Sequence, residues 1–430
     1  MKSYNEKESR RDLKWSNLFP RNGAMLKSLA ACNVRGIVSR FSCIVLLFSI
    51  SFHAAAEVYF IQHGGIADHS DAFVNGSIAN YFYERGENNT YVLNSDAIYY
   101  LDKKIVLPAN STLIGNFFID ISPSIRANPA TWQTPGEGQG TESTIIQDAM
   151  IEMMSGSKIA FVTLHGMRAV HIIVKAYGVE NITIEYTTIS GVMNDYISSP
   201  TVNPNLSLIV VSESNWIHIN HNLLRYAGYD PHHGGKVNGN SWEGSGSLIH
   251  AVRNTNLVIH DNDIAYALCA GVAFKGTVGA SVQRNIIQHT GLNRKYSDGS
   301  GVDFYSGDAL TAYSNDKIVD LNYYLNGNVI RGYLNHGIHV SGKDILIQEN
   351  RIYGGLYNGI RVSDSFGMDC SENIVIRWNE IDGGSVYGYK AIQVLDYKPG
   401  TLEIHDNTEY KGTVPVPPAI DQPCDGSSPD

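Results

Sequence analysis

Basic residues, cysteines and long hydrophobic runs are all scarce in this chain of 430 residues. It holds 32 Lys and Arg against 42 Asp and Glu, and its five cysteines form no CxxC pair. This cysteine pattern excludes a disulfide-rich scaffold and a zinc-binding motif built on cysteines. The apolar run Cys43–Ile50 is too short to span a bilayer comfortably.

The first 56 residues predict a secretory signal peptide with a long n-region. Basic residues precede the apolar run, and Ala54-Ala55-Ala56 supplies the small residues of a cleavage site. We therefore expect residues 1–56 to be removed and the protein to be secreted or periplasmic. An uncleaved signal anchor is the alternative, and the short run disfavours it.

Removal of that segment makes the chain strongly acidic. Residues 57–430 keep 23 of the 32 basic and 39 of the 42 acidic residues, a net charge of −16. Such a surface repels nucleic acid and anionic membranes, so we expect neither as a partner. An acidic polymer could bind only at a local basic cluster. We expect a monomer, in which Cys370 and Cys424 could form a disulfide bond.

An internal repeat indicates the fold. Short apolar strands end in asparagine and are followed by another apolar residue. The repeated asparagines are Asn222, Asn262, Asn285, Asn328, Asn350, Asn379 and Asn407, with gaps of 40, 23, 43, 22, 29 and 28 residues. Asparagines stacked at a turn can hydrogen-bond to one another and to the backbone, which explains their recurrence.

Strands rich in Val and Ile, such as Gly359–Ser363, lie between these asparagines without intervening amphipathic helices. The pattern predicts an all-β fold, a single-stranded right-handed parallel β-helix over residues 57–410, with two strands per coil. A short helix within Ser70–Arg85 would cap its N-terminal end. Residues 411–430 would form an extended tail.

Gly228-Tyr229-Asp230-Pro231-His232 is expected to be a further strand of this repeat. The 40-residue gap then spans two coils, and Val210, Asp230 and His250 occupy equivalent positions. Since side chains alternate along a strand, Asp230 and His232 would point outward together. A proline is unfavourable in a central strand, so its presence indicates a role other than packing.

Outward positions of successive strands collect acid–base and anion-binding side chains rather than the Lys, Glu, Thr and Ser of an ordinary solvated face. We expect one polar row, suited to an extended polysaccharide. Its predicted members are Lys175, Asp230, His232, His250, Lys275, Asp303, Tyr305, His339 and Arg361.

The Gly-x-Asp-Pro-His sequence resembles the signature of mannuronan (alginate) C5-epimerases. The resemblance implies that Asp230 and His232 are catalytic. It also implies that Arg253, just after the next strand, neutralises a substrate carboxylate. Secreted members often carry a tyrosine directly before the glycine, where this chain has Ala227, and Tyr226 lies one residue earlier.

This chemistry begins with removal of the C5 proton of a uronate, which is acidic only once the neighbouring carboxylate is neutralised. Arg253 and Lys275 could neutralise it, His232 or an ionised Tyr226 could act as the base, and Asp230 could orient His232. An epimerase returns the proton to the opposite face, whereas a lyase expels O4. No cofactor is required, although the acidic surplus would allow Ca²⁺ to bind.

Two other classes stay open. A β-helix glycoside hydrolase would need a pair of carboxyl groups, such as Asp303 with Asp308 or Asp230 with Glu243, and Trp242 could stack on a sugar. A non-catalytic adhesin would not need Asp230, His232 and Arg253 to converge.

Overall fold

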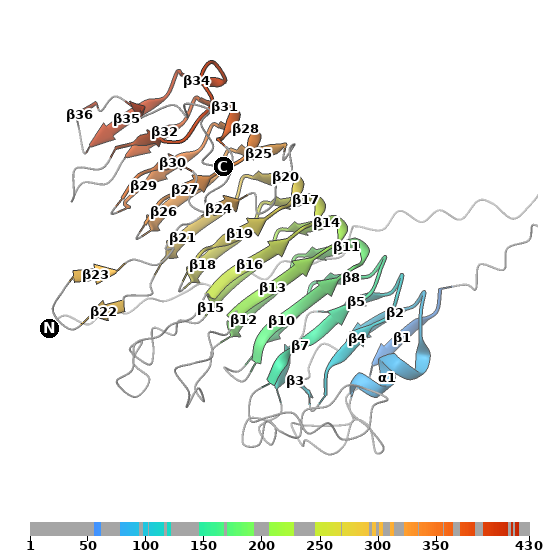
Figure 1. Ribbon diagram of the computed structural model, residues 1–430. Coiled ribbons are helices and arrows are strands. Elements are labelled where there is room, and N and C mark those ends of the chain that lie inside the picture. Colours follow the sequence, from blue (N-terminus) through green and yellow to red (C-terminus); the bar gives the residue numbers. More distant parts are fainter. Residues whose placement is uncertain are drawn as a thin grey trace, which may run out of the picture. The chain divides into compact units, whose positions relative to one another are not determined.

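The protein is a right-handed parallel β-helix with three strands in each coil. Figure 1 shows the computed structural model, in which the strands of successive coils lie side by side. The structure describes residues 56–61, 78–93, 98–101, 103–115, 118–121, 146–166, 170–192, 206–227, 246–267, 269–291, 295–297, 301–303, 310–313, 322–333, 335–355, 357–363, 370–382, 390–411, 414–415 and 418–420. Of the predicted signal segment, only residue 56 is among them.

The strands belong to three long sheets and one small one. Sheet 1 contains β1 (Val58–Ile61), β2 (Thr90–Leu93), β5 (Thr112–Ile114), β8 (Lys158–Ala160), β11 (Glu180–Glu185), β14 (Asn215–Asn220), β17 (Thr255–His260), β20 (Val278–Gln283), β25 (Tyr323–Asn326), β28 (Lys343–Gln348), β31 (Glu372–Arg377) and β34 (Leu402–His405). Sheet 2 contains β3 (Ile98–Leu101), β6 (Phe118–Ile121), β9 (Thr163–His165), β12 (Thr188–Val192), β15 (Leu223–Ala227), β18 (Asp263–Ala267), β21 (Ile286–Thr290), β26 (Val329–Tyr333), β29 (Arg351–Tyr353), β32 (Glu380–Asp382), β35 (Thr408–Lys411) and β36 (Val414–Pro415). Sheet 3 contains β4 (Ile105–Leu107), β7 (Ile146–Met153), β10 (Val170–Tyr177), β13 (Leu206–Ser212), β16 (Gly246–Val252), β19 (Val272–Lys275), β24 (Leu310–Tyr313), β27 (Ile338–Val340), β30 (Ile360–Val362), β33 (Ile392–Val394) and β37 (Ala419–Ile420). The small sheet pairs β22 (Lys295–Ser297) with β23 (Gly301–Asp303).

Each coil follows the same path, from sheet 3 to sheet 1 to sheet 2, as in β13, β14 and β15. The expectation of two strands per coil was wrong. The short strands of sheet 2 begin directly after the repeated asparagine, so in the sequence they merge with the preceding strand of sheet 1.

Alternation of side chains builds the core. In β14, Ile217 and Ile219 are fully buried while Trp216 is exposed. Parallel pairing then stacks equivalent residues of successive coils, and Ile219 lies between Ile184 and Ile259. The same inner row continues without a polar residue, through Val282, Leu325, Ile347 and Ile376. The core is therefore a column of aliphatic rows rather than one central cluster.

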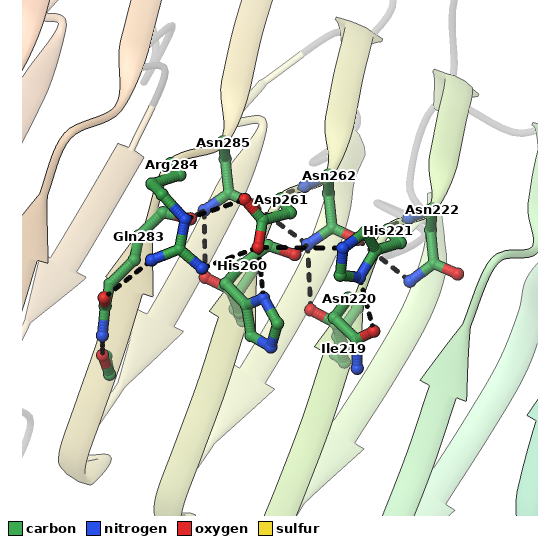
Figure 2. A network of polar contacts seen from close by, with 12 residues as sticks. Ile219, Asn220, His221, Asn222, His260, Asp261, Asn262, Gln283, Arg284 and Asn285 are labelled. Carbon is green, nitrogen blue, oxygen red and sulfur yellow. Dashed lines mark hydrogen bonds and ion pairs between the residues drawn. The ribbon is translucent and has the colours of Figure 1, made fainter.

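The asparagine ladder is confirmed, and it occupies the turn between sheets 1 and 2 (Figure 2). The amide nitrogen of Asn222 donates to the side-chain oxygen of Asn262 at 2.9 Å, and Asn262 donates in the same way to Asn285 at 2.9 Å. The series continues to Asn407. Each amide nitrogen also donates to a backbone carbonyl of the preceding coil, for example Asn262 to Ile219 at 2.9 Å. The ladder thereby satisfies polar groups that the turn would otherwise bury.

Direct contact between Asn222 and Asn262 corrects the predicted register. The 40 residues between them form one coil, because Val210 in β13 pairs with His250 in β16. Asp230 and His232 therefore do not occupy a position between Val210 and His250. They belong to residues 228–245, which connect β15 to β16 and lie outside the described residues.

The gap of 43 residues is likewise one coil, since Ala273 pairs with Thr311 in β24. The expected partner, Asp303, is instead in β23, where it pairs with Lys295 of the antiparallel β22. Placing Asp303 in the polar row was therefore wrong. Tyr305 lies outside the described residues. In both coils an insertion after sheet 2 lengthens the repeat without adding a strand to sheet 3.

Helix α1 (Ile78–Arg85) confirms a helix within the predicted cap segment. Phe82 of this helix is fully buried, with its ring centroid 4.5 Å from that of Tyr91 in β2. The apolar side of α1 thus packs on the first coils. Residues 70–77 lie outside the described residues.

Two smaller expectations concern the tail and the cysteines. Within the tail, β36 and β37 pair with β35 and β33, so these residues extend the sheets. Cys370 is disulfide-bonded to a residue outside the described ranges, and its pairing with Cys424 stays a prediction. Among the described residues, no helix combines the length and apolar character needed to cross a bilayer.

Candidate functional site

The outer face of sheet 3 carries a row of basic and imidazole side chains, which we call the sheet 3 row. Strand pairing aligns Lys175, Val210, His250, Ala273, Thr311, His339, Arg361 and Gln393, one from each successive coil. The predicted positions of Lys175, His250, His339 and Arg361 in one row are confirmed. Six coil steps separate Lys175 from Arg361, or about 29 Å at about 4.8 Å per step. This length suits a linear polymer better than a small molecule.

His250 lies near the middle of the sheet 3 row, and Lys275 lies beside the row on the same face of the sheet. Lys275 pairs with Val252, two residues beyond His250, so both side chains face outward from neighbouring strands. Burial, and secondly the positive charge of Lys275, lower the pKa of His250 below its usual value. The imidazole is therefore neutral at physiological pH, which is the form that accepts a proton.

A second group lies farther along, where His336, His339, Arg361 and Ser363 meet. Arg361 Nε donates to Ser363 Oγ at 2.9 Å, and Arg361 Nη1 lies 3.3 Å from His336 Nε2. His339 Nε2 lies 2.9 Å from the same serine oxygen. We call these four residues the Arg361 cluster. Because the guanidinium can only donate, its contact with Nε2 requires that nitrogen of His336 to act as an acceptor.

Arg361 makes no ion pair with any carboxylate of the described residues. Both imidazoles are buried, with 2% of His336 and 6% of His339 exposed. A half-buried guanidinium surrounded by imidazole and hydroxyl groups favours an anionic ligand, since a bound carboxylate would complete its hydrogen bonding.

The N-terminal end of the row differs. In the strand register, Lys175 of β10 lies beside Glu152 of β7 in the preceding coil. Glu152 also forms an ion pair with Lys104, with Nζ 2.7 Å from Oε2. This end of the row therefore combines both charges, and the basic character is concentrated from His250 onward.

Tyr226 lies on sheet 2, where it stacks on Tyr266 with ring centroids 5.2 Å apart, and Tyr266 stacks on His289 at 5.0 Å. All three residues have positive φ, between 53° and 67°, so each bends its strand at the same point. Tyr226 is thus part of a ring stack beside the connection to β16.

Arg253 directly follows the C-terminal end of β16, in the turn from sheet 3 to sheet 1, with φ 53°. There its charge acts on Tyr177, which donates to Glu213 at 3.0 Å. Six residue steps of β16 separate its two ends, about 20 Å. The structure thus places Tyr226 on sheet 2 and Arg253 in the turn from sheet 3 to sheet 1. Their catalytic roles stay predictions.

The sequence reasoning missed His336 and Thr311. His336 precedes β27 in the turn from β26, so no period-two pattern identifies it as a neighbour of Arg361. Thr311 was hidden by the insertion before β24. Asp230 and His232 lie outside the described residues, and their catalytic roles stay predictions.

Comparison with known proteins does not assign the chain to a family. No protein-family model and no curated protein matches the chain. Similar solved structures include a double mutant of a periplasmic alginate epimerase, at 12% identity over 75% of this chain and 77% of that one, with a TM-score of 0.41. An alginate lyase from Paenibacillus sp. matches at 12% identity over 85% and 98%, TM-score 0.44. A polygalacturonase from Erwinia carotovora matches at 12% identity over 85% and 96%, TM-score 0.48. These values are too low to transfer a substrate or an active-site residue.

Proposed function

We propose that this protein is an enzyme that binds an acidic polysaccharide along the sheet 3 row and abstracts the C5 proton of a uronate, which leads to C5 epimerisation. The observation that supports the proposal is that His250, His339 and Arg361 align in the sheet 3 row, with Lys275 beside the row on the same face. Residues 57–430 carry a net charge of −16, so this row is a local exception in an acidic protein. A linear polyanion is the ligand that such a row attracts while the rest of the surface repels it.

His250 and Arg361 lie too far apart to act on the same sugar. Four coil steps, about 19 Å, separate His250 from Arg361. They therefore act on different sugars of one chain. His250 and Lys275 face the reacting sugar, while the Arg361 cluster binds the carboxylate of a sugar farther along.

At the reacting sugar, Lys275 lies against the uronate carboxylate and reduces the negative charge that opposes deprotonation at C5. The neutral imidazole of His250 takes up the proton. His232 is the other candidate base, because the connection that contains it leads directly into β16. A proton delivered from the solvent to the opposite face of the ring completes epimerisation, and His250 then releases its proton to the solvent; neither step needs a cofactor.

The test is incubation of the purified chain with polymannuronate, polyguluronate, pectate and a neutral glycan. NMR should show a changed ratio of uronate epimers without chain cleavage, and EDTA should not abolish turnover. An unsaturated product would show β-elimination after the same proton abstraction. New reducing ends without unsaturation would refute proton abstraction and indicate hydrolysis.

Two variants separate the base candidates. His250→Gln should abolish turnover while binding of the polyanion stays close to the wild-type value, because Lys275 and the Arg361 cluster are intact. His232→Ala is the matched variant for the other candidate base. Near-normal turnover in His250→Gln would assign the base elsewhere, and loss in His232→Ala alone would assign it to that residue.

A further inference from the structure

The turn between sheets 1 and 2 places two histidines and an aspartate of successive coils side by side (Figure 2). His221 and Asp261 each directly precede a ladder asparagine and have φ of 54° and 55°. His260 is the last residue of β17. The hydrogen bonds of Asn222 and Asn262 hold the backbone of both turns in place. The three side chains are therefore carried by rigid positions rather than by a mobile loop.

Their ligating atoms lie within 4.8 Å of one another. His260 Nδ1 lies 2.7 Å from Asp261 Oδ2, and His221 Nε2 lies 3.9 Å from the same oxygen. The second distance is too long for a hydrogen bond. Ligand atoms about 2.0–2.2 Å from a tetrahedral ion are about 3.3 Å apart. These two distances would each have to change by about 0.6 Å to enclose an ion, and a pair at the 4.8 Å limit by about 1.5 Å.

The surroundings of His221 favour ligation through Nε2. Its Nδ1 lies 2.9 Å from Asn220 Oδ1, an acceptor that requires the proton on Nδ1 and leaves the lone pair of Nε2 facing Asp261. Tyr186 stacks on the ring, with centroids 4.7 Å apart and planes inclined by 21°. An imidazole whose second nitrogen donates to an oxygen, and whose plane is held, is the usual arrangement of a metal ligand.

Asp261 is also held from its other side. Arg284 Nε donates to Oδ1 at 2.9 Å and Nη2 to Oδ2 at 2.7 Å. A carboxylate oxygen accepts in two directions, so Oδ2 can keep its bond to Arg284 while it binds a cation. In the metal-bound form His260 gives up the Nδ1 proton that otherwise bonds to Oδ2.

We propose that His221, His260 and Asp261 bind a divalent transition-metal ion, with Zn²⁺ as the best match, and that the ion links two successive coils. Two imidazole nitrogens and one carboxylate oxygen suit Zn²⁺ and similar ions, whereas Ca²⁺ and Mg²⁺ require oxygen ligands. Water would complete the coordination, since all three side chains are accessible, His221 most of all. The site lies away from the sheet 3 row, so its role is structural.

The chain contains a matched control. His405 and Asp406 repeat the His260–Asp261 pair at the same point of a later coil, with Nδ1 2.8 Å from Oδ2. In that part of the ladder, Trp378 occupies the position equivalent to His221. The later coil therefore has two of the three ligands, and the proposal requires it to bind far more weakly.

The experiment titrates metal-free, full-length protein with ZnCl₂ by calorimetry, with thermal unfolding measured in parallel. We expect one Zn²⁺ per chain and a raised melting temperature. His221→Asn and His260→Gln should each weaken binding at least about tenfold, the lower end of what even second-shell changes cause. His405→Gln should bind as the wild type does.

Binding should also weaken as the pH falls, because protons compete for both imidazoles, and it should release protons in proportion to the Zn²⁺ bound. Equal affinity in the wild type and in both variants, equal loss in His405→Gln, or no binding would overturn the proposal. His221→Asn decides the matter if His260→Gln is misfolded, since the side chain of His221 is exposed. Polysaccharide turnover should be unchanged in His221→Asn, which keeps this test separate from that of the enzyme activity.

Discussion

Replacement of Asn285 by alanine tests whether the asparagine ladder stabilises the β-helix. Asn285 is fully buried, and its side chain takes part in five hydrogen bonds. Its nitrogen donates to Ile259 O, Gln283 O and Asn328 Oδ1, at 2.9, 3.0 and 3.1 Å. Its oxygen accepts from the backbone and side-chain nitrogens of Asn262, at 3.0 and 2.9 Å. Asn285→Ala removes all five.

The expected cost follows from these contacts. A net contribution of about 1 kcal/mol per bond gives an upper sum of about 5 kcal/mol, and three-centre sharing at the amide nitrogen lowers it to about 3–5 kcal/mol. The buried N–H of Asn262 is left without an acceptor, which keeps the cost at the upper part of this range. Domains are stable by about 5–15 kcal/mol, so the variant should fold but unfold much more easily.

Asn407→Ala is the matched control, because it removes the last asparagine of the same ladder. Asn407 is only half-buried, and its side chain makes three of these bonds, one to Ile376 O and two from Asn379. Its replacement should cost about half as much or less. Urea unfolding followed by circular dichroism and by tryptophan fluorescence measures both. Equal costs, or a loss below about 1 kcal/mol for Asn285→Ala, would refute the reasoning.

Three further predictions concern single groups. Burial raises the pKa of the Glu409 carboxyl group from 4.5 to about 7, so the unfolded chain loses this proton at a lower pH than the folded chain does. The free energy of unfolding should therefore fall as the pH rises between these two values. Glu409→Gln should flatten the dependence of melting temperature on pH, and an unchanged slope would contradict this prediction. Gly355→Ala places a Cβ 1.9 Å from the ring of buried Tyr333 and should cost about 1–3 kcal/mol, which Tyr333→Leu in the same chain should partly restore in a double-mutant cycle. Burial and the charge of Lys275 lower the pKa of His250. The midpoint of the acid limb of the rate–pH profile should therefore lie below 6.5, the usual pKa of histidine, and Lys275→Gln should move this midpoint to higher pH. A midpoint that does not move would exclude His250 as the base.

The sequence alone determined everything that depends on local periodicity. Alternation in the strands identified which residues face outward, so the outward places of Lys175, His250, His339 and Arg361 were predictable. The ladder was predictable for a similar reason, since asparagine recurs at the same point of each turn. Both signals are read from a short segment at each strand or turn, and neither requires knowledge of which coils are neighbours.

Only the tertiary structure decided which coils are neighbours. Insertions after sheet 2 lengthen two coils to 40 and 43 residues, and spacing cannot distinguish an insertion from a further coil. This excluded Asp303 from the sheet 3 row and removed the separate coil that was expected to contain Asp230. It also brought His336 from a turn to Arg361, and His221 from one coil to Asp261 in the next. Those contacts are made by long-range strand pairing, whose register depends on the whole stack rather than on any single segment.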